Sequence, residues 1–319
     1  MSAVLQVRDL EVAYHTSAGP VRAVNGVSFE LEPGERLGLV GESGSGKSTI
    51  ALALLRMIRP PGKIEGGEVV LDGTSLLPLS DEEMRRMRLA SIAMIAQGAM
   101  NSLNPVARVR AQIADCFRDH DVQLSNRELD ERISSLLERV GLQPSVANMY
   151  PHELSGGMKQ RVCIAIAICL SPKVIIADEP TSALDVVVQR QVMDTLQVVQ
   201  TDIGASIILI GHDMGLMAQV VNRLGVMYAG DLVEIAAVSD MFGDPLHPYT
   251  QLLIGSLPSL SSKRLMRAIP GLPPSLLNRP AGCPFRARCP HVMSRCETEN
   301  PALRQVRPNR QVACHLYDS

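Results

Sequence analysis

Three short apolar runs, each bounded by charged or turn residues, punctuate the chain: Arg36 to Val40, Val174 to Ala177 and Ser206 to Ile210. Apolar residues follow one another in these runs, without the alternation that marks a strand with one solvent-facing side. Parallel strands are buried on both faces because helices cover them. The runs therefore predict buried parallel strands of an α/β protein.

Between the first two runs the spacing of apolar residues becomes helical. The S-x-x-E capping box at Ser125 to Glu128 is followed by apolar residues three or four positions apart, up to Gly141. A second capping box at Ser80 to Glu83 predicts a short helix through Ala90. The run Ile50 to Ile58 predicts a further apolar helix directly after the first strand.

Proline divides the chain into two parts. Eleven of its 21 prolines lie in the last 79 residues, Met241 to Ser319. Such a density of proline predicts loops and turns in place of long helices and strands. We therefore expect a main domain over residues 1–240 and a loop-rich extension over residues 241–319.

Composition narrows the class of protein. Apolar residues make up 46% of the 319 and charged residues 20%, as in globular proteins. Lys and Arg number 31 against 33 Asp and Glu, so the basic surface of a general nucleic-acid binder is not expected. The longest apolar runs fall short of the ~20 residues that span a bilayer. With no signal-peptide pattern at the N-terminus, the cytoplasm is the expected compartment.

A glycine-rich loop connects the first strand to the apolar helix. Residues Gly41 to Ser48, GESGSGKS, match G-x-x-x-x-G-K-[ST] between a predicted strand and a predicted helix. Backbone N–H groups of such a loop face phosphates, while Lys47 reaches the β- and γ-phosphates and Ser48 ligates Mg²⁺. The nucleotide-binding residues predicted here are Gly41, Ser43, Gly44, Gly46, Lys47, Ser48 and Thr49.

An acidic pair ends the second strand. Asp178 and Glu179 follow the run Val174 to Ala177. Beside a phosphate loop, Asp178 is expected to hold Mg²⁺ and Glu179 to polarise the attacking water as a general base. The alternative is a solvated turn at a strand end.

The segment Leu154 to Arg161, LSGGMKQR, lies about 20 residues before the acidic pair and opens an apolar helical run. It resembles the signature of ABC ATPases. The resemblance implies a RecA-like parallel-sheet core with a helical subdomain at about residues 98–159. It also implies that Ser155, Gly156 and Gly157 meet the γ-phosphate of a nucleotide bound to a partner ATPase subunit, through a helix N-terminus.

The same resemblance assigns further residues in chain order. Tyr14 matches the aromatic that stacks on adenine, Gln97 the Q-loop glutamine that meets Mg²⁺, Asp185 the end of the D-loop and His212 the switch histidine. Tyr14 and His212 have the alternative of packing in the core. Gly98 departs from the family pattern, which commonly has an acidic residue there; its effect is left open.

The extension resembles the C-terminal region of ATPases from oligopeptide, dipeptide and nickel importers. The resemblance rests on Gly243 to Gln251, Ile269 to Ser275, the cysteine-rich tail, and Asn101 to Pro105 after the Q-loop. It implies an ATP-hydrolysing subunit that energises solute import, with peptides as the expected solute. Nickel and oligosaccharides are alternatives within the family, and a soluble ABC ATPase acting on nucleic acid or ribosomes is the alternative from another class.

The resemblance also implies the partners. Two permease chains would hold the ATPase at the cytoplasmic face of the inner membrane, with a solute-binding protein acting outside. Two ATPase subunits would close on two ATP molecules, and family habit favours a related second ATPase over an identical copy. The sequence fixes neither the solute nor the composition of this dimer.

Four of the seven cysteines, Cys283, Cys289, Cys296 and Cys314, lie in the last 37 residues. In a reducing compartment such a cluster predicts a metal centre before disulfides. Their spacing lacks the C-x₂-C pairs of structural zinc, so a [4Fe-4S] cluster is the first expectation and zinc the alternative. Free cysteines in a loop are the remaining interpretation. A metal-dependent tail is expected to loosen on Cys289→Ser while the nucleotide site stays largely intact.

Overall fold

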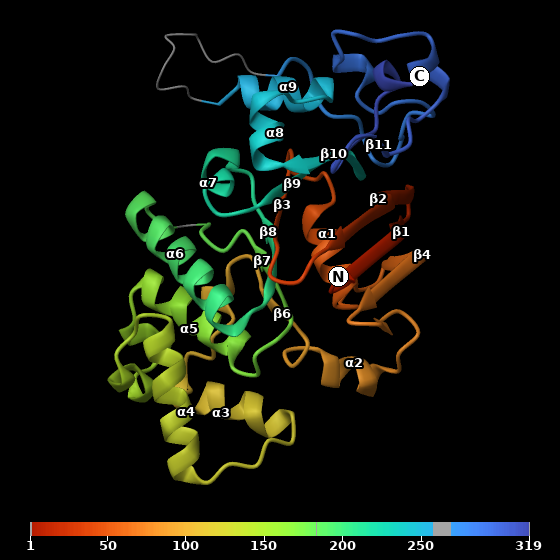
Figure 1. Ribbon diagram of the computed structural model, residues 1–319. Helices are drawn as coiled ribbons and strands as arrows, with labels where there is room; N and C mark the ends of the chain where they lie inside the picture. Colours follow the sequence, from red (N-terminus) through yellow and green to blue (C-terminus); the bar gives the residue numbers. More distant parts are fainter. Residues whose placement is uncertain (1, 183, 258–268, 319) are drawn as a thin grey trace. The chain divides into compact units, whose positions relative to one another are not determined.

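The computed structural model in Figure 1 describes residues 2–182, 184–257 and 269–318. Two compact units account for the chain. The first unit contains residues 1–4, 31–35 and 78–209, and the second contains residues 5–30, 36–77 and 210–319. Each unit is described by itself.

In the first unit, three strands lie in the order β8, β7, β6. β6 (Ile92–Ile95) runs parallel to β7 (Val174–Asp178), and β8 spans Ser206–Ile210. Every residue of β7 and β8 is buried, so the prediction of strands covered on both faces is confirmed for these two runs.

Helices make up most of the remaining first unit. Their bounds are α2 Asp81–Met87, α3 Val109–Asp119, α4 Asn126–Arg139, α5 Gly156–Ile168 and α6 Val186–Ile203, with short 3-10 turns η1 Ala99–Asn101, η2 Pro144–Asn148 and η3 Pro151–Glu153. Both predicted capping boxes form, at Ser80 with Glu83 and at Ser125 with Glu128. α2 ends at Met87, earlier than predicted, because Arg88 is extended.

The second unit contains an antiparallel sheet with the order β2, β1, β4, β5, whose first three strands lie side by side in Figure 1. The bounds are β1 Leu5–Thr16, β2 Gly19–Leu31, β4 Gly62–Leu71 and β5 Thr74–Ser75. Tyr14 near the end of β1 pairs with Gly62 at the start of β4. The spacing of apolar runs had predicted only the parallel part of the fold.

Five further strands of the second unit lie in the order β11, β12, β10, β9, β3. Their bounds are β3 Arg36–Val40, β9 Arg223–Tyr228, β10 Asp231–Ala237, β11 Arg304–Arg307 and β12 Arg310–Val312. β3 and β9 are parallel, while β10 is antiparallel to both β9 and β12. The predicted extension is therefore more than loops: its last two strands continue the sheet that begins at β3.

The helices of the second unit are short. They are α1 Lys47–Leu54, α7 Met214–Ala218, α8 Val238–Gly243, α9 Pro248–Gly255 and α10 Arg295–Thr298, with 3-10 turns η4 Arg286–Arg288 and η5 His315–Tyr317. α1 is shifted toward the N-terminus relative to the predicted run Ile50 to Ile58, because helical geometry begins inside the glycine-rich loop.

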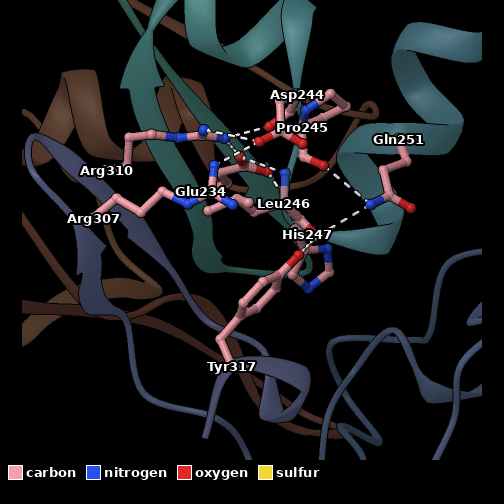
Figure 2. A network of polar contacts seen from close by, with 9 residues as sticks. All are labelled: Glu234, Asp244, Pro245, Leu246, His247, Gln251, Arg307, Arg310 and Tyr317. Atoms are coloured by element: carbon pink, nitrogen blue, oxygen red, sulfur yellow. Dashed lines mark hydrogen bonds and ion pairs between the residues drawn. The ribbon is translucent and has the colours of Figure 1, made fainter. Parts of the chain in front are cut away.

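A buried carboxylate joins the extension to the sheet, as Figure 2 shows. Glu234 of β10 is fully buried and accepts hydrogen bonds from the N–H groups of Leu246 (2.9 Å) and His247 (2.8 Å). Burial raises the pKa of Glu234, and the two N–H groups act against this rise. Arg310 of β12 lies 3.9 Å from the Glu234 carboxylate and 3.3 Å from that of Asp244. A buried charge with these partners costs less than an isolated one, so the network fixes the tail onto β10.

Candidate functional site

The glycine-rich loop lies in the second unit between β3 and α1. Its lysine is buried, and the Lys47 Nζ donates to the carbonyl oxygens of Gly41 (2.9 Å) and Glu42 (2.9 Å) and to Ser45 Oγ (3.2 Å). Gly46 caps α1 in the left-handed region, at φ 104°. The loop thus wraps its own lysine and presents a helix N-terminus, as phosphate binding requires.

Three positions of this loop have φ angles that favour glycine. Gly41, Gly44 and Gly46 have φ values of 147°, 76° and 104°. At Gly46 an added Cβ would lie 2.2 Å from the backbone oxygen of Ala23. At Gly44 an added Cβ would have no neighbour within 4 Å. A side chain would therefore clash with the backbone at Gly46, whereas at Gly44 it would meet open space and cost only the strain of the left-handed backbone.

Gly46→Ala is expected to lower nucleotide affinity by tenfold or more and to destabilise the fold by about 1–3 kcal/mol, because backbone must move away from the new Cβ. Gly44→Ala is the matched control, since it introduces only left-handed strain of about 1–2 kcal/mol without a clash. Isothermal titration with Mg-ATP and thermal unfolding of the full chain measure both effects. Equal affinity losses in the two variants would contradict the steric argument.

Two other predicted residues share the second unit with the loop. His212 is exposed and follows Gly211, whose N–H donates to the carbonyl of Leu39 in β3 at 3.2 Å. This bond places the backbone before His212 beside β3, the strand that leads into the glycine-rich loop. The half-buried Tyr14 is opposite Gly62 in the β1–β4 ladder, where an added Cβ would lie 2.7 Å from the Tyr14 ring. The missing side chain at Gly62 makes room for the aromatic ring.

The first unit brings together two of the predicted catalytic residues. Gln97 Nε2 donates to Glu179 Oε2 at 2.8 Å, although 82 positions separate them. Glu179 has a φ of 45°, which is uncommon for a residue with a side chain, and it directly follows the buried Asp178 at the end of β7. Strained backbone of this kind concentrates at functional sites.

Gly98, the departure from the family pattern, adopts φ 66° and ψ 26° and precedes η1. Glycine meets this left-handed conformation without the cost of about 1–2 kcal/mol that a side chain incurs. An added Cβ would lie 3.6 Å from Asn101 Nδ2, an ordinary contact. The glycine therefore sets the direction in which the chain leaves Gln97, and the Gln97–Glu179 bond forms with glycine at this position.

The signature segment begins α5. Ser155 is its N-cap, and its hydroxyl oxygen accepts a hydrogen bond from the N–H of Met158 at 3.3 Å. Gly156 and Gly157 form the first turn of the helix. An added Cβ at Gly157 would lie 2.7 Å from Val188 Cγ1 of α6. Glycine at this position is thus a packing requirement as well as a candidate phosphate contact.

Asp185, predicted from the D-loop, caps α6. Its Oδ1 accepts hydrogen bonds from the N–H groups of Val187 (3.1 Å) and Val188 (3.0 Å). An N-cap carboxylate stabilises a helix by about 1 kcal/mol. Ala183 of the same loop lies outside the described residues. The structure therefore gives Asp185 a structural task, and its nucleotide contact stays a prediction.

The four clustered cysteines line one small cavity of about 10 Å³ in the second unit, together with His247, His291 and His315. Burial raises the pKa of Cys283 to about 12 and raises that of Cys289 and Cys314. Within residues 2–182, 184–257 and 269–318, no group of three or more His, Cys, Asp or Glu side chains is arranged to hold a metal ion. The predicted metal centre thus has a shared cavity and no ready ligand set.

Sequence reasoning missed the residues that hold the glycine-rich loop from outside. The Glu42 carboxylate, within the loop, forms an ion pair with Arg288 of η4 at 2.8 Å. The N–H of Glu42 donates to the hydroxyl of Tyr249 in α9 at 3.0 Å. Tyr249 lies within the motif Gly243 to Gln251, but nothing in that motif points to the loop, and no motif marks Arg288. More than 200 positions separate each from Glu42, so only the folded chain reveals these contacts.

Comparison with known families identifies both parts of the chain. Residues 24–182 match the family described as ABC transporter, and residues 233–296 match the family described as Oligopeptide/dipeptide transporter, C-terminal region. The first region contains the glycine-rich loop, Gln97, the signature and the acidic pair. The second contains Tyr249, Arg288 and three of the four clustered cysteines.

Curated relatives match over almost the whole chain. The oligopeptide transport ATP-binding protein OppD of Bacillus subtilis is 43% identical, covering 98% of this chain and 88% of its own. The dipeptide transport ATP-binding protein DppD of Caldanaerobacter subterraneus is 41% identical, covering 100% and 98%. OppD of Escherichia coli is 43% identical, covering 98% and 93%.

Solved structures match the cassette. A dimeric ATP-binding cassette in a post-hydrolysis state, bound to ADP and Pi, superposes with a TM-score of 0.65 at 26% identity. It covers 73% of this chain and 98% of its own. The expected ABC ATPase fold is confirmed. Together with the full-length relatives, this shows that the chain belongs to the family of ATP-binding subunits of oligopeptide and dipeptide ABC transporters, which are ABC-type ATPases.

Proposed function

We propose that this chain hydrolyses ATP to drive the import of peptides through a pair of membrane permease chains. The observation that carries the peptide substrate is the match of residues 233–296 to the oligopeptide/dipeptide C-terminal region, because that family is described for transporters of these peptides. Relatives named for oligopeptide and dipeptide transport support the same substrate. Nickel and oligosaccharides are the alternatives.

The proposed chemistry assigns one role to each residue. Lys47 and the loop N–H groups bind the β- and γ-phosphates, Ser48, Gln97 and Asp178 hold the magnesium shell, and Glu179 accepts a proton from the attacking water. Tyr14 stacks on adenine, and His212 contacts the γ-phosphate. The buried Lys47, the buried Asp178 and the Gln97–Glu179 hydrogen bond support these roles.

Two ATPase subunits are proposed to complete each site. Ser155, Gly156 and Gly157 at the start of α5 would face the γ-phosphate of a nucleotide held by the partner subunit, and Asp185 would lie close by. The free N–H groups of a helix start suit that charge. Closure excludes water and strengthens the electrostatic contacts to the phosphates, and hydrolysis releases it. The second ATPase is proposed to be a related chain.

A groove beside Gln97 is the proposed docking site of the permease. It has a volume of about 350 Å³, and apolar side chains of Met94, Leu103 and Ile166 line it with the polar Asn104 and Asp115. Val106, next to the groove in sequence, is 82% exposed. A permease element seated there would meet the residues that flank Gln97, so the glutamine could report nucleotide state to the membrane.

The proposed location is the cytoplasmic face of the inner membrane, with an external solute-binding protein delivering the peptide. No helix among the described residues is long and apolar enough to cross a membrane. A peripheral position held by permease chains accords with that finding. The proposed domain limits are residues 1–240 for the cassette, with a helical part at about 98–159, and residues 241–319 for the extension.

Uptake tests the function. Cells expressing this chain with its permease chains and binding protein should accumulate a labelled oligopeptide, and the variant Lys47→Ala should not. Labelled nickel and a labelled oligosaccharide are measured in parallel. Uptake of nickel or of the oligosaccharide, without uptake of the peptide, would identify that solute as the substrate.

Cell fractionation tests the alternative of a soluble ABC ATPase. A chain that stays with ribosomes or nucleic acid, and never with the membrane when permeases are present, would contradict transport.

We also propose that Cys283, Cys289, Cys296 and Cys314 bind a [4Fe-4S] cluster, with zinc as the alternative. The cavity that all four cysteines line supports this proposal. No group of side chains among the described residues is already arranged as metal ligands. Binding would therefore require the thiols to lose their protons and move closer together. Anaerobically purified protein is then expected to be brown, to absorb near ~400 nm and to contain about four irons per chain. A content of one zinc per chain would show that the cysteines bind zinc, and protein without any metal would contradict the proposal.

A further inference from the structure

The phosphate loop is held by the extension at one residue, Glu42. Its N–H donates to Tyr249, and its carbonyl oxygen accepts from Lys47 Nζ (2.9 Å) and from the N–H of Ser45 (3.2 Å). Its carboxylate is bound by Arg288. Every polar group of Glu42 is therefore occupied, and two of these contacts come from residues 249 and 288 of the extension.

Arg288 binds the Glu42 carboxylate in a bidentate manner, through two hydrogen bonds. Nη1 donates to Glu42 Oε2 at 2.9 Å and Nη2 donates to Oε1 at 2.8 Å. The side chain of Arg288 is only 4% exposed, and its Nε donates to the carbonyl of Pro270 at 2.9 Å. Paired, planar contacts of this kind are stronger and more directional than a single ion pair.

Aromatic side chains pack against the Arg288 side of this ion pair. The rings of Tyr228, Tyr249 and Phe285 lie within 5.4 Å of one another, centroid to centroid, and the Arg288 guanidinium lies 5.7 Å from the Tyr228 ring centroid. Nη1 of Arg288 also donates to the Tyr228 hydroxyl at 3.2 Å. The hydrogen bond with Glu42 raises the pKa of Arg288. The Arg288 side of the pair is buried, so water weakens this pair less than one exposed on both sides.

The charge of Glu42 needs such a partner. In the proposed function the loop binds a triphosphate, and a carboxylate within the loop repels that ligand unless a cation neutralises it. Lys47 is engaged with loop carbonyls and is assigned to the phosphates. Arg288 supplies the compensating charge and fixes the Glu42 peptide whose carbonyl contacts Lys47.

We propose that Arg288 is a positioning residue for the phosphate loop, through which the C-terminal extension sets the affinity for ATP. The inference rests on the proposed role of residues Gly41 to Ser48 in binding phosphate. Arg288 does not touch ATP; it neutralises Glu42 and holds the loop in its binding shape.

Affinity for Mg-ATP, measured by isothermal titration on the full chain, tests the proposal. Arg288→Met is expected to weaken binding by about tenfold or more, since it leaves the Glu42 carboxylate unpaired beside the phosphates. Adding Glu42→Gln to Arg288→Met removes that charge and should recover most of the lost affinity. A merely structural arginine predicts no such rescue. Turnover at saturating ATP should change less than KM.

Arg307→Met is the matched control. It breaks another ion pair of the extension, to Asp244 at 2.6 Å, which does not involve the phosphate loop (Figure 2). Its ATP affinity should equal that of the wild type. If Arg288→Met proves too unstable to measure, Arg288→Lys retains the positive charge without the paired hydrogen bonds and should weaken binding severalfold. Unchanged affinity in Arg288→Lys would overturn the claim that these paired bonds position the loop.

Lys47→Ala separates the two possible failures. If Lys47→Ala loses ATP binding while Arg288→Met binds as tightly as the wild type, the phosphate loop is correctly assigned and Arg288 has no positioning role. If Lys47→Ala binds ATP like the wild type, the loop assignment itself is wrong, and the inference falls with it. If Arg288→Met is weakened but Glu42→Gln brings no rescue, charge compensation is rejected.

Discussion

Glu179→Gln is expected to reduce ATP hydrolysis by about 10²-fold or more while ATP still binds. A positioned general base commonly contributes 10²–10⁴ to a rate, and the amide cannot accept the proton of the attacking water. Glutamine has nearly the same size, so the contact with Gln97, now 2.8 Å from Glu179 Oε2 to Nε2, can persist between the two amides. The loss should therefore be in turnover.

Turnover is measured in the assembled transporter, and ATP binding by titration of the same variant. Glu128→Gln is a matched control, because Glu128 in the same unit closes the capping box of α4 and lies outside the candidate site. It should cost about 1 kcal/mol of stability at most and leave turnover unchanged. Turnover near the wild-type rate in Glu179→Gln would eliminate Glu179 as the base.

His212→Ala is expected to lower turnover similarly, through the lost γ-phosphate contact.

The elements that sequence predicts best are those whose signals are local. The runs Arg36 to Val40 and Ser206 to Ile210 are β3 and β8 to the residue, since turn and charged residues stop each run. The capping box at Ser125 places the start of α4, and Gly141, with φ 69°, follows its end. Caps and apolar runs act within four residues, so the sequence contains all of their information.

The contacts that sequence misses are those that tertiary structure makes. The β11–β12 hairpin follows a proline-rich stretch whose composition predicts loops, and pairing with β10 decides its structure. Glu42 and Arg288 are 246 positions apart, and neither stands out among the charged residues. The expectation that Cys289→Ser leaves the nucleotide site largely intact stays a prediction, to be measured beside the Arg288 variants because Arg288 precedes Cys289 and contacts the phosphate loop.

The candidate site itself combines both kinds of information. Motif spacing named Gln97 and Glu179 separately, and their hydrogen bond across 82 positions is a product of folding. The motif at Ser155 to Gly157 gave no hint that Gly157 packs against Val188. This packing changes how the role of the signature must be tested, since a large residue at Gly157 disturbs its own subunit before it meets a partner's nucleotide.

Gly157→Asp is expected to abolish ATP-driven closure of the ATPase dimer while each subunit still binds ATP. In the proposed dimer, the carboxylate would lie beside the γ-phosphate of the partner's nucleotide in a site without water, where like charges repel strongly. Light scattering or crosslinking in the Glu179→Gln background, which prevents hydrolysis, measures closure. Titration with Mg-ATP measures binding by the single subunit.

Steric and electrostatic effects must be separated, because a Cβ at Gly157 would lie 2.7 Å from Val188 Cγ1. Gly157→Ala has the same Cβ without the charge, and Val188→Ala removes the obstructing methyl groups. In the Val188→Ala background, Gly157→Ala should close on ATP, whereas Gly157→Asp should not. The difference between these two double variants isolates the effect of the carboxylate on the partner's phosphate. If the Gly157→Asp variant closes at the ATP concentration that closes the wild-type dimer, Gly157 does not act across the dimer. Failure of both variants would restrict Gly157 to packing within its own subunit.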